Sequence, residues 1–260
     1  MPPDTPPLTD RTRQNGRVDP IEAIRRAQAA ELVDEDGHDV ELELHPGLAP
    51  EEIAAVEAEA GEPLPRELRT LLAYTAGLDG ALETVDFTGR TLSFEDRDIF
   101  PAALPIAHDG FGNHWVVDLT PDERETATVF FACHDPPVVL YQSPTLGHFL
   151  QEAFRLSLPP HESLVDDVHE DRPFRVWREN PGVLDREAAL AGDEDLRAFA
   201  AALDDRFVFV DLRSPEVGMG FSWGRYGPRT EIRRHGYRRL FAYARPERKA
   251  GLLSRLFARS

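Results

Sequence analysis

The stretch Leu104–Leu119 carries the clearest hydrophobic pattern in the chain. Two apolar runs, LPIA and HWVVDL, flank HDGFGN, in which Asp109-Gly110 and Gly112 supply the positive-φ positions that a tight turn needs. Alternate positions of the second run carry Trp115, Val117 and Leu119. This spacing predicts a hairpin whose Trp115 face is buried and whose opposite face, with His114, Val116 and Asp118, is at least partly solvated.

Other short runs with strand character lie on both sides of this hairpin. They are VELEL (40–44), ETVDF (83–87), TLSF (91–94), ATVFFAC (127–133) and VVLY (138–141). Because the runs between 81 and 141 follow one another without helices between them, they predict an antiparallel meander.

Capping signals predict helices that cover this sheet. Asp19 can cap a helix with Pro20 at its first position and Glu22 in its first turn, and Gly37 lies beyond its end. A helical hairpin is predicted next, with helices that begin at Pro50 and Pro65 and that are closed by Gly61 and Gly77. A later helix is predicted with Ser143 as its cap and Pro144 as its first residue, ending near Leu158.

The chain beyond residue 158 has a different character. Residues 1–16 are rich in proline and read as a tail, and residues 17–158 as the main domain. Residues 159–184 are broken by proline, contain an acidic cluster, and read as a linker or a strap over that domain. Residues 185–260 predict an α+β extension, with a helix over 193–203, strands over 207–212 and 240–243, and a basic terminal helix that contains Leu252, Leu253, Leu256 and Phe257. The pattern leaves open whether this extension continues the first sheet or folds separately.

Charge narrows the possible partners. The formal net charge is −18, which disfavours nucleic acid as a partner of the main domain and makes a charge-selected protein partner plausible. From Phe221 onward the chain has eleven basic and two acidic residues, a net charge of +9, which leaves a net charge of −27 for the preceding residues. Attraction between these two parts is the simplest account, and a patch for nucleic acid or lipid headgroups is the alternative. With a single cysteine, Cys133, no signal-like start and no long apolar run, the sequence indicates a cytoplasmic protein that does not enter the membrane.

Two groups of residues invite a chemical interpretation. Asp109 could orient His108 or His114 as a general base, and His134-Asp135 could join them as metal ligands. Asp-Gly is ordinary turn chemistry, however, and no nucleophile or paired His-x-His spacing accompanies these histidines. The glycines of GMGFSWGRYG lack the order and the lysine of a phosphate loop, and they predict turns and close strand packing instead. We therefore expect no catalytic residues, no metal and no cofactor.

The order of these segments resembles the SUKH superfamily, which includes a fungal regulator of cell-wall synthesis and bacterial immunity proteins of toxin systems. The resemblance rests on GLAPEEIAAVEAEAGEPLP running into RELRTLLAYTAG, on LPIAHDGFGNHWVVDL, on TVFFACHD and on the closing helix with Phe149-Leu150. It covers about residues 19–158. The resemblance implies an α+β fold with helices packed on an antiparallel meander, and a bacterial protein that binds other proteins and is not an enzyme.

The implied function is neutralisation of a toxin, of nuclease type, or regulatory scaffolding. A basic toxin domain is the expected partner, and the oligomeric state stays open. Candidate contacts are acids and exposed groups on the predicted loops: Glu83, Asp86, Asp96, Asp98, Asp109, Phe111 and Asn113. The alternative is a small-ligand-binding protein or a hydrolase that uses the loop region of His108, Asp109 and His114.

Overall fold

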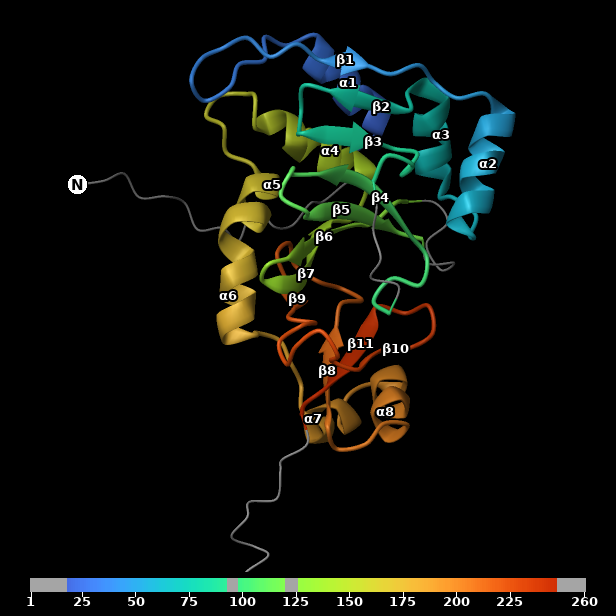
Figure 1. Cartoon of the computed structure of the whole chain (residues 1–260), viewed down its shortest axis with the longest axis vertical. Helices are drawn as coiled ribbons and strands as arrows, with labels where there is room; N and C mark the ends of the chain where they lie inside the picture. The colour runs from blue at the N-terminus through green and yellow to red at the C-terminus, as the bar shows by residue number, and fades with distance from the viewer. Residues whose placement is uncertain (1–17, 93–97, 120–125, 247–260) are drawn as a thin grey trace, which may run out of the picture.

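The structure is a computed structural model that describes residues 18–92, 98–119 and 126–246 (Figure 1). Its fold is mixed α+β, as the sequence predicted. An eight-stranded antiparallel sheet has the order β1-β2-β3-β4-β5-β6-β7-β9, and a three-stranded antiparallel sheet has the order β10-β11-β8. The first seven strands follow their order in the chain, so the predicted meander is confirmed.

The strands of the large sheet are β1 (Glu43–Leu44), β2 (Gly77–Asp79), β3 (Thr84–Asp86), β4 (Ala103–His108), β5 (His114–Asp118), β6 (Val129–His134), β7 (Pro137–Ser143) and β9 (Gly220–Phe221). The small sheet contains β8 (Phe207–Asp211), β10 (Ile232–Arg234) and β11 (Leu240–Ala244). The helices are α1 (Pro20–Gln28), α2 (Pro50–Ala60), α3 (Arg66–Tyr74), α4 (Leu146–Arg155), α5 (Leu164–Asp166), the π-helical turn η1 (Asp167–Asp171), α6 (Arg172–Glu179), α7 (Arg186–Leu190) and α8 (Glu194–Ala201).

Trp115 lies at the centre of the large sheet, under α4 and the strap. It is 1% exposed, and its ring packs at 5.0 Å from Phe131 and 6.0 Å from Phe149 of α4. Its indole Nε1–H donates to Gln142 Oε1 at 3.1 Å, and Gln142 Nε2 donates to the carbonyl of Leu164 in the strap. The buried Trp115 face is therefore confirmed, and one chain of hydrogen bonds fixes the strap to it.

On the opposite face of β5, His114 is half-buried, but Val116 and Asp118 are buried, which corrects the prediction of a partly solvated face at these two positions. Val116 is fully buried, and Asp118 is 2% exposed. Arg234 binds both carboxylate oxygens of Asp118, at 3.0 and 2.8 Å, and Arg239 Nε lies 3.4 Å from Oδ2. Two arginines of the small sheet thus supply the countercharge that lets a carboxylate leave solvent.

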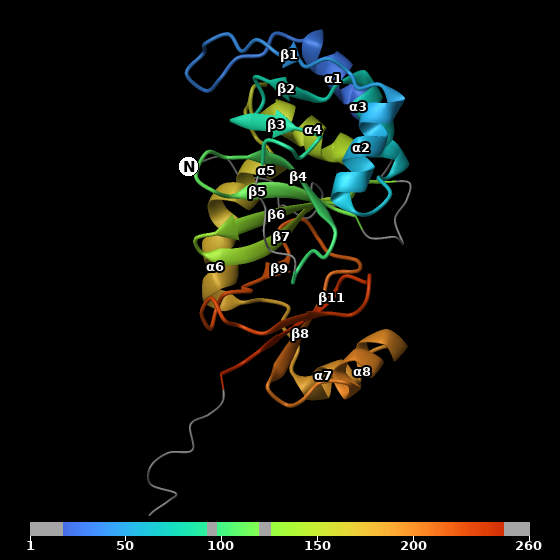
Figure 2. The ribbon, with the colours of Figure 1, turned by 45° about the vertical axis from the view of Figure 1, so that its right-hand side comes forward.

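Aromatic side chains complete the contact between the two sheets. Phe100 lies 5.2 Å from Phe130 of β6 and 6.5 Å from Phe241 of β11, between ring centroids. Figures 1 and 2 show the small sheet below the large one, with α7 and α8 on its far side. Because β9 joins the large sheet while β8, β10 and β11 form the small one, the C-terminal part contributes to both.

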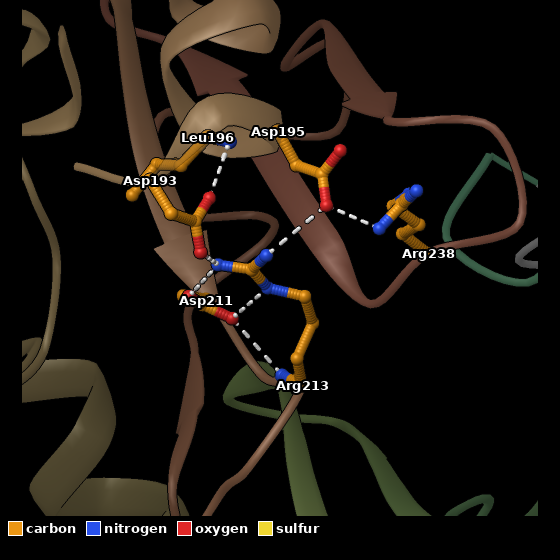
Figure 3. Close-up of polar contacts among 6 residues, drawn as sticks. All are labelled: Asp193, Asp195, Leu196, Asp211, Arg213 and Arg238. Carbon is orange, nitrogen blue, oxygen red and sulfur yellow. Dashed lines mark hydrogen bonds and ion pairs between the residues drawn. The ribbon is translucent and has the colours of Figure 1, made fainter.

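Acids of the C-terminal part pair with its own arginines (Figure 3). Arg213 binds Asp211 and Asp193 at 2.6 Å each and lies 3.5 Å from Asp195, which also pairs with Arg238. The pair of Arg238 with Asp195, together with the Asp118 contacts, favours the simpler interpretation of the basic C-terminal region, in which it attracts acids of the same chain. The predicted terminal helix around Leu252 lies outside the described residues.

Several predicted boundaries are wrong. Helix α1 begins at Pro20 with Asp19 as its cap, but it ends at Gln28, well before Gly37. Gly77 does not close α3 but begins β2. Ser143 ends β7, and the cap of α4 is Thr145.

The predicted strand over 91–94 is not formed by Thr91 and Leu92, its two described residues. The predictions also omitted α7, β10 and the helices of the strap. No helix in the described ranges combines the length and the apolar character needed to cross a membrane.

Candidate functional site

The tip of the β4–β5 hairpin, residues 108–114, is built around the carboxylate of Asp109. Its Oδ1 accepts the backbone N–H of Phe111 at 2.8 Å and that of Asn113 at 3.1 Å, which closes the turn. Its Oδ2 accepts Nδ2 of Asn113 and lies 2.9 Å from Nε2 of His169 in the strap. The side chain of Asp109 is 6% exposed, so its main role is to hold the tip and the strap together.

The hydrogen bonds around Asp109 lower its pKa. Burial acts to raise the pKa, but the hydrogen bonds from Asn113 and His169 and from the backbone outweigh it and hold the pKa below its ordinary value. Asp109 is therefore ionised at neutral pH, and its negative charge is shared among donors inside the protein.

The three histidines considered as catalytic or metal-binding residues have the hydrogen bonds and burial of residues that support the fold. His108 Nδ1 accepts the backbone N–H of Gly110 at 2.8 Å, and Nδ1 of His134 lies 3.1 Å from Oδ1 of Asn113. Burial, followed by the nearby His108, lowers the pKa of His114 below its ordinary value. The ring centroids of His108 and His114 lie 6.2 Å apart. At this separation neither imidazole is placed as a general base against a second reactive group.

Phe111 is the exposed apolar group of the tip. It is 78% exposed, more than any other large hydrophobic side chain in the described ranges. Glu83 is exposed next to Gly110, the neighbour of Phe111 in the turn, since a Cβ added to Gly110 would lie 3.4 Å from Cγ of Glu83. Asn113 is partly buried and supports the turn through Asp109 and His134. Phe111 and Glu83 are therefore the exposed candidate contacts at the tip, and Asn113 and Asp109 support the turn.

Asp86 and Asp98, two of the remaining predicted contacts, do not join the tip. Asp86 is 7% exposed, and its carboxylate accepts hydrogen bonds from the hydroxyl and N–H groups of Thr88 and Thr91, at 2.6 to 2.9 Å. Burial acts to raise the pKa of Asp86, but these bonds lower it overall. We therefore omit Asp86 from the candidate surface. Asp98 is exposed but lies toward the Ala103 end of β4, opposite the tip, and Asp96 lies outside the described residues.

Two acidic segments lie on the same side as the tip. The acidic loop, residues 31–45, contains seven acids and no lysine or arginine: Glu31, Asp34, Glu35, Asp36, Asp39, Glu41 and Glu43. Residues 159–171 of the strap contain five acids and likewise no lysine or arginine: Glu162, Asp166, Asp167, Glu170 and Asp171. In Figures 1 and 2 the loop after α1, helix α5 and the tip of the β4–β5 hairpin lie on one side of the molecule.

The pKa of Asp166 shows that these segments influence each other. It is raised, first by burial and then by the charge of Glu170, with a further contribution from Glu35 of the acidic loop. A carboxylate surrounded in this way is stabilised by an approaching positive charge.

Two groups of side chains in the described ranges have the geometry to hold a metal ion. In each group the ligand atoms lie within 4.8 Å of one another: Asp34, Asp36 and His38 in the acidic loop, and Asp166, His169 and Glu170 in the strap. Carboxylate and imidazole donors suit zinc or manganese. Neither group contains the histidines that the sequence suggested.

A groove of about 430 Å³ lies between α1 and α4. Val18, Ala23, Phe154 and Leu158 give it apolar walls, and Arg26 and Arg155 lie at its margin. It does not include the hairpin tip or its histidines, so it does not support the hydrolase alternative.

Comparison with protein families finds a match over a segment that includes α2, α3, the meander from β2 to β7 and most of α4. These residues, 47–152, match the SMI1 / KNR4 family (SUKH-1). Residues 47–152 are a SUKH-1 segment. No curated protein and no solved structure matches the chain.

The SUKH-1 match confirms the family resemblance and places the hairpin tip within it. The family includes immunity proteins. The acidic loop precedes the matched residues and the strap follows them. Sequence reasoning recorded the acids of the strap but not their proximity to the tip, and it overlooked the charge run of residues 31–45, which is visible in the sequence.

Proposed function

We propose that this chain is a non-enzymatic protein-binding protein that neutralises a basic toxin domain. The family of its SUKH-1 segment supports the class of function, because that family includes immunity proteins. The observation that carries the proposal is the hairpin tip, where a 78% exposed phenylalanine stands on a turn held by a buried carboxylate.

Phe111 has the properties of a binding anchor. The backbone on both sides of it is fixed by Asp109, so a partner that covers the ring orders little additional chain. Aromatic residues that enter a partner pocket from a fixed position often provide a large share of the binding energy. Glu83, which lies next to Gly110 of the same tip, adds a charge that favours a basic pocket.

The net charge supports a basic partner. A nuclease toxin has a basic groove for its substrate, and a chain with a formal net charge of −18 is attracted to such a groove. The range of this attraction shortens as the salt concentration rises, because salt screens the charges. Binding across the groove would exclude nucleic acid. Charges at the margin of the contact raise the association rate, whereas Phe111 sets the lifetime of the complex.

The test begins with a toxin domain encoded beside the gene for this chain. Co-expression of the chain should restore growth of cells that produce the toxin domain, and the purified proteins should form a complex. Phe111→Ala should accelerate dissociation about 30-fold, the equivalent of roughly 2 kcal/mol.

The matched control is Tyr237→Ala, because Tyr237 is a 53% exposed aromatic residue of the small sheet's β10–β11 connection. This variant should dissociate at the native rate. The proposal fails if the chain gives no rescue, or if Phe111→Ala and Tyr237→Ala behave alike.

A further inference from the structure

We propose that His169 of the strap, residues 159–184, is a positioning residue that holds the hairpin tip in the shape that binds the partner. The inference rests on the proposed function and adds a determinant of binding outside the SUKH-1 segment, which ends at residue 152. His169 acts through Asp109 on the backbone that carries Phe111, so the strap controls how this ring is presented.

The contact between the strap and the tip is direct. Nε2 of His169 lies 2.9 Å from Oδ2 of Asp109. Oδ1 of the same carboxylate accepts the N–H groups of Phe111 and Asn113, at 2.8 and 3.1 Å, and these two bonds close the turn. Because both oxygens belong to one rigid planar group, a donor that fixes Oδ2 also fixes Oδ1 against the two N–H groups.

The ring of His169 is itself held by packing. Its centroid lies 5.8 Å from that of Trp115 and 5.4 Å from that of Phe131, and its side chain is 25% exposed. A donor that is fixed by packing restricts its acceptor more than a mobile surface side chain does. His169 therefore connects the tip to the core around Trp115.

The strap has further attachments that do not involve the tip. Before His169, the N–H of Leu164 donates to Oε2 of the buried Glu152 of α4 at 2.9 Å. After it, Oγ of Ser222 donates to the carbonyl of Val176 in α6 at 3.2 Å. These contacts hold the strap on both sides of η1, so a change at His169 should release the tip and leave the strap in place.

A second support of the tip limits the size of the effect. Oδ1 of Asn113 accepts the N–H of His134 in β6 at 3.0 Å, and this bond remains when His169 is changed. The tip should therefore loosen without losing its fold. A partner that covers Phe111 must then order the loosened turn, which weakens binding even though no residue in the contact has changed.

Three variants of the full chain separate these effects. His169→Phe keeps an aromatic ring against Trp115 and Phe131 but has no N–H donor for Asp109. His169→Gln keeps an N–H donor on a side chain of similar reach. The control is His161→Asn, because His161 is another histidine of the strap, its Nδ1 lies 2.9 Å from the carbonyl of Leu156, and asparagine tolerates its φ of 62°.

Amide hydrogen exchange, followed by NMR, measures the tip without a partner. In His169→Phe the amides of Phe111 and Asn113 should exchange about tenfold faster, as expected for the loss of one hydrogen bond to a charged group. Both amides should stay within about threefold of their native rates in His169→Gln and in His161→Asn. Thermal melting establishes that the variants are folded, and His169→Leu replaces His169→Phe if the latter is unfolded.

A double-mutant cycle with the toxin domain tests whether His169 acts through Phe111. His169→Phe should accelerate dissociation of the complex about fivefold. In a chain that already carries Phe111→Ala, the same change should add less than about twofold, because the ring that His169 positions is then absent. A residue that merely stabilises the whole fold would not show this dependence on Phe111.

Native exchange rates of both tip amides in the folded donor-less variant would overturn the inference, as would equal acceleration in His169→Gln or His161→Asn. A fivefold effect on dissociation that persists beside Phe111→Ala would also overturn it. The exchange assay contains no toxin, so its failure leaves the rescue experiment unaffected. Failure of rescue together with the expected exchange rates would instead remove the proposed function and leave His169 as the support of the tip.

Discussion

Asp118 provides the sharpest test of how the two sheets are held together. Its side chain is 0% exposed, and those of Arg234 and Arg239 are 3% and 8% exposed, so three charges are buried where the sheets meet. Asp118→Asn keeps the shape and most hydrogen-bonding capacity but removes the negative charge. The guanidinium group of Arg234 would then remain buried without the carboxylate that binds it on two oxygens.

The expected cost is about 3–5 kcal/mol, the range found when one partner of a buried ion pair is removed. Arg234 keeps three carbonyl acceptors, on Ile99, Tyr237 and Arg238, which limits the loss to that range. Since domains are typically stable by about 5–15 kcal/mol, this single change should remove a large part of the free energy of unfolding.

Urea unfolding followed by tryptophan fluorescence, to which Trp115, Trp177 and Trp223 contribute, measures the effect. Asp98→Asn is the matched control, because it makes the same chemical change at an exposed position and should alter the free energy of unfolding by less than about 0.5 kcal/mol. A third variant, Asp118→Leu with Arg234→Met and Arg239→Met, replaces all three charges by apolar groups. It should be more stable than Asp118→Asn, because the charge of Arg234 is removed together with that of Asp118.

A free energy of unfolding of Asp118→Asn within about 1 kcal/mol of that of the native chain would refute this account of the buried ion pair. The account would also be wrong if the triple apolar variant were less stable than the single one, since the charges would then contribute more than their desolvation costs.

Three further predictions concern single residues. Because the pKa of Asp109 is lowered in the folded chain, its stabilisation is present above its unfolded pKa of about 4 and is lost as pH falls through the folded value; Asp109→Asn should therefore be clearly less stable than native at pH 7, with a smaller difference at pH 3, by urea unfolding. Burial raises the pKa of the Cys133 thiol to about 11, so at pH 7.5 a thiol reagent should label it only after denaturant is added, and rapid labelling of the folded chain would contradict its 4% exposure. A Cβ on Gly220 would lie 1.9 Å from the carbonyl oxygen of Val139, so Gly220→Ala should separate β9 from β7 and cost about 2 kcal/mol or more. Gly227→Ala meets no neighbouring atom and carries only the backbone strain of a φ of +103°, so it should cost less than Gly220→Ala.

The sequence by itself determined the elements whose signals lie within a few residues of one another. Asp19 and Pro20 start α1 because the cap and the proline act on adjacent backbone groups. Gly61 closes α2 in the left-handed conformation, and Asp109-Gly110 forms the hairpin turn, for the same local reason. These features allowed the α+β class, the meander and the family of residues 47–152 to be inferred.

Only the tertiary structure decided what depends on partners far apart in the chain. Gly77 resembled a helix end but pairs with Asp86 in the sheet, and Thr145 rather than Ser143 caps α4 because Ser143 belongs to β7. Asp118 resembled a solvent-facing residue, because the pattern along one strand cannot show that Arg234, more than a hundred positions later, neutralises it.

The candidate surface also depends on contacts between residues far apart in the chain. The exposed Phe111 and the charge runs 31–45 and 159–171 can be read from the sequence, but their position on one side of the molecule depends on contacts such as His169 with Asp109, 60 residues apart. Local propensity fixes short elements because its interactions span one turn. Strand pairing and ion pairs between distant residues depend on bringing remote parts of the chain together, which no local sequence pattern encodes.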